Sequence, residues 1–263
     1  MPEARADGLR ISFDDLGTGE PALLLLPGWA VDRNAFADLA ALTSKHRRTL
    51  ALDWRGHGKS DDPGSDFGTG ELAEDALAVI EASGADQVVP VAQAHAGWVA
   101  LELLRRLPAR IPKLVFLSWI VLDPPPPFVE LLRAMAAREQ TEQAREQLFS
   151  IWLEGVEDAR IERFVREEMG GYDPEMFRRG AREILAAYER HGAPLRLLAE
   201  LGGGKSALHL YAQPLQDEYL QAQQAFASDH QWFAVEWMEG RSHFLMLEMP
   251  RPLAARIEEF VRV

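Results

Sequence analysis

Short, largely apolar runs constrain the fold of this chain more than any other feature of its sequence. The first, residues 22–26, is wholly apolar and stops at Pro27 and Gly28, and the next three stop at Asp53, Gln93 and Ser118. Runs this short with apolar residues on both faces are typical of strands buried in a parallel sheet. The runs occupy residues 22–26, 48–52, 87–92, 113–117 and 207–211.

Segments with helical periodicity lie between the runs, at residues 36–43, 70–84 and 97–107. Strands that alternate with such segments predict an α/β fold with a doubly wound, mostly parallel sheet. Ligands bind such sheets at the carboxyl ends of the strands, so the residues after each run are the first candidates for a site. Before the first run, residues 9–14 alternate between apolar and polar and predict an edge hairpin that Gly17 and Gly19 terminate. Disorder is expected only in about six N-terminal residues.

The strand pattern disappears between residues 123 and 201. We expect an all-helical cap there, inserted into a core formed by residues 1–122 and 202–263. A last strand at 234–238 and an amphipathic helix at 252–263 complete the core. The helical stretches of the cap fall at residues 129–137, 142–154, 159–169 and 176–188.

The composition excludes several other kinds of protein. The 263 residues include no cysteine, which removes disulfides, thiol nucleophiles and cysteine-held metal centres. With 41 acidic and 28 basic side chains the net charge is −13, which argues against nucleic acid as a partner. No apolar stretch reaches the roughly 18 residues of a membrane span, and the N-terminal residues lack the apolar core of a signal peptide. We expect a cytoplasmic globular protein, a monomer or homodimer, with no membrane partner.

Three motifs follow the first three buried runs: Leu26-Pro-Gly-Trp29, Asp53-Trp-Arg-Gly-His-Gly58 and Ala92-Gln-Ala-His-Ala-Gly97. The third has the shape of a nucleophile elbow, a tight strand-to-helix turn that lifts its central residue to the top of the sheet. That residue is Ala94, so the elbow carries no nucleophile. Near the C-terminus, His243 lies in the loop after the last predicted strand, where the base of an α/β-hydrolase fold is found.

Taken together, these landmarks predict an α/β-hydrolase fold. Beyond the fold, the sequence resembles the cofactor-free 3-hydroxy-4(1H)-quinolone 2,4-dioxygenases, which cleave the ring of 3-hydroxyquinaldine and alkylquinolones and release carbon monoxide. The matching stretches are Pro27-Gly-Trp29, Trp54-Arg-Gly-His-Gly58, the elbow with His95 and Gly97-Trp98, Ser118-Trp119, Trp152-Leu-Glu-Gly155, Glu167-Glu-Met169, Gln213-Pro214, Glu218-Tyr219, Trp232-Phe233 and His243-Phe244.

The resemblance implies a role for each matching position. His243 takes the place of the base that removes the 3-hydroxyl proton, and the substrate anion itself reacts with molecular oxygen. The backbone N–H groups of Trp29 and His95 take the place of the oxyanion hole. Trp29, Trp119, Trp152 and Phe244 are expected to contact an aromatic heterocyclic substrate. No metal and no cofactor are implied, and the remaining histidines show no metal-ligand spacing with carboxylates.

Two positions depart from that family. Ala94 replaces the elbow serine, which serves these dioxygenases as a hydrogen-bond partner but which an esterase requires as its nucleophile. Ser118 stands where the family has the aspartate that orients the base, and loss of such a carboxylate from a related triad costs on the order of 10⁴ in rate. Asp123 and Asp217 are the alternative acids to support His243.

Three other functions remain open on these residues. The chain could keep the histidine base and dispense with oxygen, as a lyase, isomerase or cyclase of a related enolisable ring. It could be a hydrolase whose elbow serine was replaced by Ala94. It could also be a binding protein that retains the pocket for a signalling quinolone without turning it over.

Overall fold

The apolar runs of the sequence form the centre of one sheet. The computed structural model describes residues 2–202 and 204–262, and in this part of the chain eight strands pair in the order β1-β2-β4-β3-β5-β6-β7-β8. β2 is antiparallel to β1 and β4, and all later pairs are parallel. The strands are β1 (Glu3–Ala6), β2 (Leu9–Leu16), β3 (Ala22–Leu26), β4 (Thr49–Leu52), β5 (Val88–Gln93), β6 (Lys113–Leu117), β7 (Ser206–Tyr211) and β8 (Phe233–Trp237).

Helices cover both faces of this sheet. One layer contains α1 (Ala37–Thr43), α10 (Leu245–Glu248) and α11 (Pro250–Arg262), which contact one another. The other contains α2 (Thr69–Ser83), α3 (Ala96–Arg106) and α8 (Pro194–Gly202). This arrangement confirms the predicted α/β-hydrolase fold, because apolar residues on both faces of a strand require cover on both sides.

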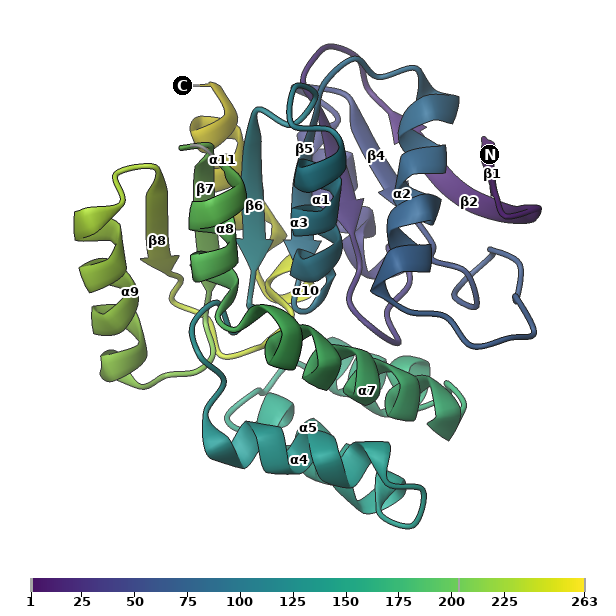
Figure 1. Ribbon diagram of the computed structural model, residues 1–263, viewed down its shortest axis with the longest axis vertical. Helices are drawn as coiled ribbons and strands as arrows, with labels where there is room; N and C mark the ends of the chain where they lie inside the picture. Colours follow the sequence, from purple (N-terminus) through teal and green to yellow (C-terminus); the bar gives the residue numbers. More distant parts are fainter. Residues whose placement is uncertain (1, 203, 263) are drawn as a thin grey trace.

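The remaining helices between β6 and β7 lie apart from these layers. Figure 1 shows α4, α5 and α7 passing below the arrowheads of the strands, at the carboxyl end of the sheet. α8 instead runs alongside the sheet, where it packs on α3. The helices below the sheet are α4 (Pro126–Ala136), α5 (Thr141–Leu153), α6 (Ala159–Arg163), the π-helical turn Phe164–Met169 and α7 (Pro174–His191).

Two elements differ from the sequence-based expectation. Residues 9–14 lie in β2, which belongs to a hairpin at the edge of the sheet, but the edge strand itself is β1. This partner precedes β2 and joins it through a turn in which Asp7 and Gly8 have φ of 51° and 84°. The expectation that about six N-terminal residues are disordered was therefore wrong for Glu3–Ala6. The helix α9 (Asp217–Asp229), which packs on β8, was not predicted because its apolar residues are too sparse to produce a clear helical period.

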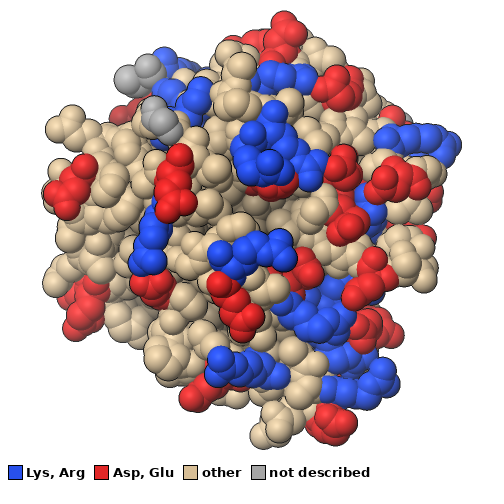
Figure 2. Space-filling view, in the orientation of Figure 1, with Lys and Arg blue, Asp and Glu red and all other residues tan. Residues whose placement is uncertain are grey.

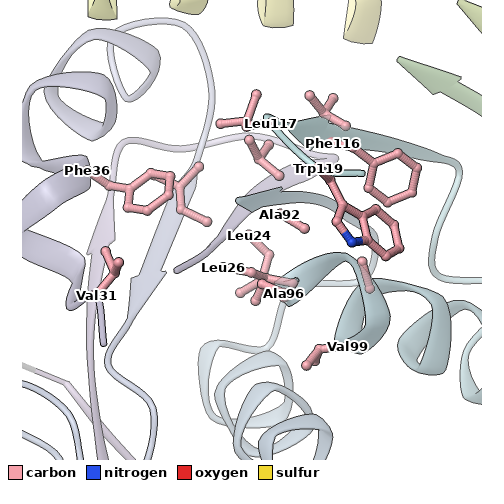
Figure 3. Close-up of a cluster of buried hydrophobic side chains, with 14 of the residues drawn as sticks. Leu24, Leu26, Val31, Phe36, Ala92, Ala96, Val99, Phe116, Leu117 and Trp119 are labelled. Carbon is pink, nitrogen blue, oxygen red and sulfur yellow. The ribbon is translucent and has the colours of Figure 1, made fainter. Parts of the chain in front are cut away.

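The core lies between the sheet and its helices. Figure 3 shows side chains of β3, β5 and β6 packed with Trp119, the second residue after β6. Gly97 in α3 faces this indole, and a Cβ at Gly97 would meet the Trp119 ring at 2.2 Å. The α3 helix can therefore approach the end of β6 only with glycine at this position.

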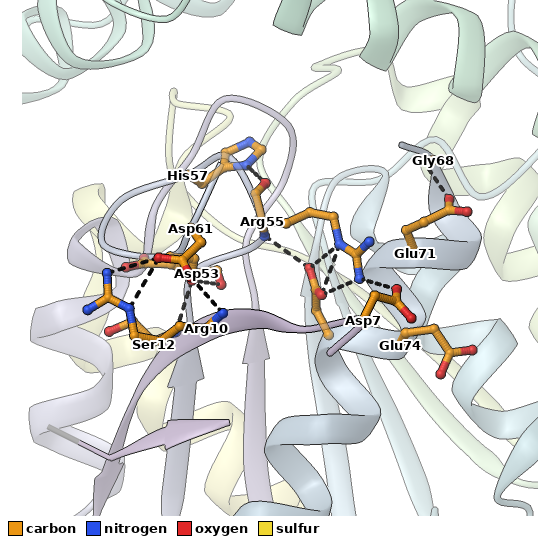
Figure 4. A network of polar contacts seen from close by, with 12 residues as sticks. Asp7, Arg10, Ser12, Asp53, Arg55, His57, Asp61, Gly68, Glu71 and Glu74 are labelled. Carbon is orange, nitrogen blue, oxygen red and sulfur yellow. Dashed lines mark hydrogen bonds and ion pairs between the residues drawn. The ribbon is translucent and has the colours of Figure 1, made fainter. Parts of the chain in front are cut away.

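A polar network holds the loop after β4. The Asp53 carboxylate accepts hydrogen bonds from the backbone N–H groups of Arg33 and Lys59, at 2.8 and 2.9 Å. Arg55 pairs with the buried Asp75 at 2.7 Å and with Asp7 at 3.0 Å (Figure 4). Buried charges need such partners, so this loop is fixed where it approaches the strand ends.

The surface mixes charges of both signs. Figure 2 shows basic and acidic side chains interspersed over the face in view, with no continuous basic stripe on it. Within the described ranges, 2–202 and 204–262, no helix combines the length and apolar character needed to cross a bilayer.

We predict that G97A destabilises the protein by about 1–3 kcal/mol, because the added methyl group overpacks the Trp119 ring. Urea unfolding followed by tryptophan fluorescence measures this change. The matched control is G70A in α2, where a Cβ meets no atom within 4 Å and better helix propensity should leave stability unchanged or raise it by up to about 1 kcal/mol. Equal effects of the two substitutions would contradict the packing argument.

Candidate active site

The loops after β3, β5 and β6 meet at a cavity of ≈ 870 Å³ beneath the helices that follow β6. Most of the residues singled out in the sequence line it, and Asp217 does not. Those that line it are Trp29, Ala94, His95, Ser118, Trp119, Asp123, Trp152, His243 and Phe244.

The turn after β5 has the backbone geometry of an elbow. Ala94 has φ of 49°, in the left-handed region that costs an L-residue roughly 1–2 kcal/mol. Its N–H donates to the carbonyl of Leu117 at 2.8 Å, and its carbonyl accepts from Gly97 N–H at 3.0 Å. The elbow is therefore formed in full, but it presents a methyl group to the cavity where a hydrolase presents its nucleophile.

Two backbone N–H groups at the cavity are free to bind a ligand. Among the described residues, neither Trp29 N–H nor His95 N–H has an acceptor. The loop that carries Trp29 is held on both sides: Gly28 N–H donates to Gln93 Oε1 at 2.9 Å, and Ala30 N–H donates to His57 Nε2 at 3.2 Å. Buried N–H groups without a partner are rare, so this pair fits the predicted oxyanion hole.

His243 lies against aromatic side chains. Its ring stacks on Trp152 at 4.8 Å with an interplanar angle of 13°, and Phe244 contacts it edge-on. Its Nε2 atom is buried without a hydrogen-bond partner in the described part of the chain. Burial lowers the pKa of His243 to about 3, because the apolar surroundings disfavour the charged imidazolium.

No carboxylate within residues 2–202 and 204–262 pairs with His243. Ser118, where the resemblance implied an aspartate, is buried, and its Oγ also has no hydrogen-bond partner among the described residues. Asp123 is 73% exposed in its side chain and pairs with Arg196 at 3.6 Å. Asp217 lies in the first turn of α9. Neither alternative acid forms a hydrogen bond or an ion pair with His243 in the described part of the chain.

His95 and Trp119 form a hydrogen-bonded pair beside the elbow. The Trp119 indole N–H donates to His95 Nδ1 at 3.2 Å, and the His95 ring stacks on Phe128 of α4. Burial, together with the smaller effect of the nearby His243, lowers the pKa of His95 to about 3. Trp119 is only 2% exposed and packs in the core, so its contact with the cavity is small.

The sequence analysis missed the apolar wall of the cavity. Residues at helical spacing along α4 supply one side, and residues of α5 supply another. The signal was present as amphipathic spacing, but which face of a helix meets a cavity depends on packing. The wall residues include Phe128, Leu131, Leu132, Met135, Leu148 and Ile151.

No group of three histidine, aspartate or glutamate side chains that could hold a metal ion occurs in the part of the chain that the structure describes.

Comparison with known proteins extends these findings. A family model described as "alpha/beta hydrolase fold" matches residues 21–161. The 2-heptyl-3-hydroxy-4-quinolone dioxygenase AqdC1 of Rhodococcus erythropolis is 35% identical over 243 residues, which are 92% of this chain and 87% of that protein. The 1H-3-hydroxy-4-oxoquinoline 2,4-dioxygenase of Pseudomonas putida is 33% identical over 264 residues and the full length of both chains. The structure of AqdC, described as binding the product of Pseudomonas quinolone signal cleavage, matches with a TM-score of 0.94, 32% identity and 100% of both chains.

The fold and the site define an α/β-hydrolase-fold protein that has an elbow without a nucleophile. Full-length identity above 30% then gives the narrower group: the chain belongs to the family of 3-hydroxy-4-quinolone 2,4-dioxygenases. This membership confirms the resemblance seen in the sequence.

The lowered pKa of the buried histidines predicts an acid-sensitive fold. The unfolded chain binds a proton near pH 6.5 that folded His243 binds only near pH 3, so stability is present above pH 6.5 and is lost as the pH falls between these values. We predict that H243Q lowers the slope of unfolding free energy against pH by about 1 kcal/mol per pH unit between about pH 6 and 4. Urea unfolding across this range measures it.

The control is H46Q, at an exposed position, which should keep the slope of the parent protein. If H243Q and the parent protein had the same slope, His243 would bind its proton equally well in the folded and the unfolded chain, which would contradict the lowered pKa.

Proposed function

We propose that this chain catalyses ring-cleaving 2,4-dioxygenation of a 3-hydroxy-4-quinolone, with His243 as the base and without a metal or organic cofactor. The observation that carries the proposal is one cavity lined by a stacked, unpartnered histidine and by two free N–H groups, with no nucleophile at the elbow. The named relatives confirm that the enzyme class expected from the sequence is the right one. The assignment of roles to individual residues is our proposal.

In this reaction His243 accepts the proton of the 3-hydroxyl group. In the absence of substrate, the low pKa of His243 makes protonation of its ring unfavourable. A substrate anion beside the ring favours the imidazolium and so raises this pKa. The anion and the imidazolium therefore stabilise each other in a cavity with an apolar wall, where the attraction between charges is stronger than in water. The N–H groups of Trp29 and His95 supply fixed dipoles for the negative charge on the substrate oxygen.

The electron-rich ring anion then reacts with molecular oxygen, which we propose as the second substrate. Within the helical insertion at 123–201, α4 and α5 act as the cap: they contribute apolar residues over the carboxyl ends of the strands and keep water from the anion. Trp152 stacks on His243, so it is placed to hold the ring next to the base.

The cavity also favours a substrate with an alkyl chain. Its ≈ 870 Å³ lies near the upper end of the range of about 300–1,000 Å³ for drug-sized ligands, which is more than a bare bicyclic ring needs. The wall formed by Leu131, Leu132, Met135 and Ile151 is apolar. An alkyl chain of the substrate would be removed from water when it packs against this wall, which favours binding. We propose a 2-alkyl-3-hydroxy-4-quinolone as the preferred substrate.

We predict that anaerobic mixing with 2-heptyl-3-hydroxy-4-quinolone produces the red-shifted absorbance of the anion, and that air then bleaches it with oxygen uptake and carbon monoxide release. The unsubstituted ring should show a KM at least roughly tenfold higher, because each buried methylene contributes about 0.8 kcal/mol. Stopped-flow absorbance, an oxygen electrode and gas analysis measure these steps.

H243A should abolish anion formation, whereas H46Q, at an exposed position, should leave it unchanged. Turnover without oxygen uptake would replace the proposal by a lyase, isomerase or cyclase activity. Binding without turnover by the parent protein, with affinity unchanged in H243A, would indicate a binding protein.

We predict that S118D raises kcat by roughly 10- to 1,000-fold, because it returns a carboxylate to the position that orients the base in this family. Position 118 has φ of 49°, a region that aspartate adopts more readily than most residues. Single-turnover kinetics measures the gain. The pH profile of kcat/KM should shift to a higher pKa for the base.

The matched control is S118N, which has the shape of aspartate without its charge and should show neither the gain nor the shift. A folded S118D enzyme with the parent rate and pH profile would show that Ser118 does not act on His243.

A further inference from the structure

Trp119 is fixed through both of its backbone polar groups. Its N–H donates to His209 Nε2 at 3.3 Å, and its carbonyl accepts from the Tyr219 hydroxyl at 2.9 Å. His209 is itself buried, and its Nδ1 lies 2.6 Å from Gln223 Oε1. Because Nε2 of His209 accepts from Trp119, its proton lies on Nδ1 and is donated to Gln223.

The side chain of Trp119 then determines the state of His95. An indole N–H can only donate, so the His95 Nδ1 that faces it at 3.2 Å must be unprotonated. Burial keeps the imidazole neutral at ordinary pH, since its pKa is lowered to about 3. A neutral imidazole carries one proton, which must therefore lie on Nε2.

Among the described residues, the side-chain hydrogen bond of His95 is the one to Nδ1, and Nε2–H has no acceptor. The ring that carries it lines the cavity between Phe128, on which it stacks, and Tyr188, which contacts it edge-on. These contacts leave the ring little freedom to turn over. His95, which lines the cavity, therefore carries a side-chain donor in addition to its free backbone N–H.

We infer that the His95 side chain is a second substrate-binding donor, through Nε2–H, and that Trp119 is the positioning residue that fixes its proton there. The inference rests on the proposed function for the identity of the acceptor, which is an oxygen of the 3-hydroxy-4-oxo pair of the quinolone. It makes the site selective for ligands with an acceptor oxygen at this position, because an analogue without one leaves a buried N–H unpaired.

The first experiment needs no substrate. Long-range ¹H–¹⁵N correlation spectra of the ¹⁵N-histidine-labelled protein distinguish the two neutral forms of an imidazole. We expect His95 to be protonated on Nε2 in the parent protein and to show a mixture in W119F. The matched control is W98F, because the Trp98 indole N–H is buried beside Trp119 without a partner in the described chain and its loss should leave the His95 signals unchanged. A parent His95 protonated on Nδ1 would overturn the inference, even if W119F fails to fold.

The second experiment measures anaerobic binding of 2-heptyl-3-hydroxy-4-quinolone by fluorescence. H95L should weaken binding by about 10- to 100-fold, the cost of one hydrogen bond to a charged oxygen. H95Q, whose amide offers a donor at a similar reach, should recover at least half of the loss on a logarithmic scale. W119F should weaken binding by roughly fivefold and W98F by less than twofold.

Equal affinity of H95L and the parent protein would overturn the substrate-binding role of the side chain. The outcomes also separate this inference from the proposed function. If the parent protein binds the quinolone but does not consume oxygen, the dioxygenase assignment fails while the His95 donor stands. If the parent protein turns the quinolone over with oxygen uptake and H95L binds it with the parent affinity, the dioxygenase assignment stands and the His95 donor fails.

Discussion

Three sharp turns at the carboxyl end of the sheet determine this site. Ala30, Ala94 and Ser118 all have φ near 50°, in the left-handed region that L-residues seldom occupy. Each such residue costs of order 1–3 kcal/mol, and the strands that lead into these turns offset that cost because they are fully buried on both faces. The turns make the chain leave the strands abruptly, so the N–H groups of Trp29 and His95 are left without acceptors in the described fold.

The low polarity of this site governs its chemistry. His57 and His209 are buried, and His95 and His243 are half-buried at the cavity. Loss of water around these imidazoles lowers each pKa to between about 3 and 4. Neutral imidazoles act as directed donors and acceptors, and three of the four are used in this way within the protein. Of these four described histidines, His243 is the one whose ring has no hydrogen-bond partner, so its Nε2 atom is available to an acidic substrate hydroxyl.

Much of the fold was predictable because short apolar runs of this kind are compatible with few structures other than buried strands. The runs at 22–26, 113–117 and 207–211 became β3, β6 and β7 within one residue at each end. β1 was missed because four residues with alternating burial are too short for a pattern. The site was predictable only as a set of positions. The motifs identified Trp29, Ala94 and His243, and the serine at position 118 in place of an aspartate, but they could not show that neither Asp123 nor Asp217 pairs with His243.

The sequence by itself determined the sheet, the elbow without a nucleophile and the single histidine near the C-terminus, because these depend on residue identity and local pattern. Only the tertiary structure decided that Asp123 pairs with Arg196 at the surface, that Trp152 stacks on His243, and that Trp119 donates to His95. The physical reason is that hydrogen-bond direction, stacking and desolvation depend on which side chains meet across elements distant in the sequence. Those contacts, and not the motifs, set the protonation states on which the proposed chemistry depends.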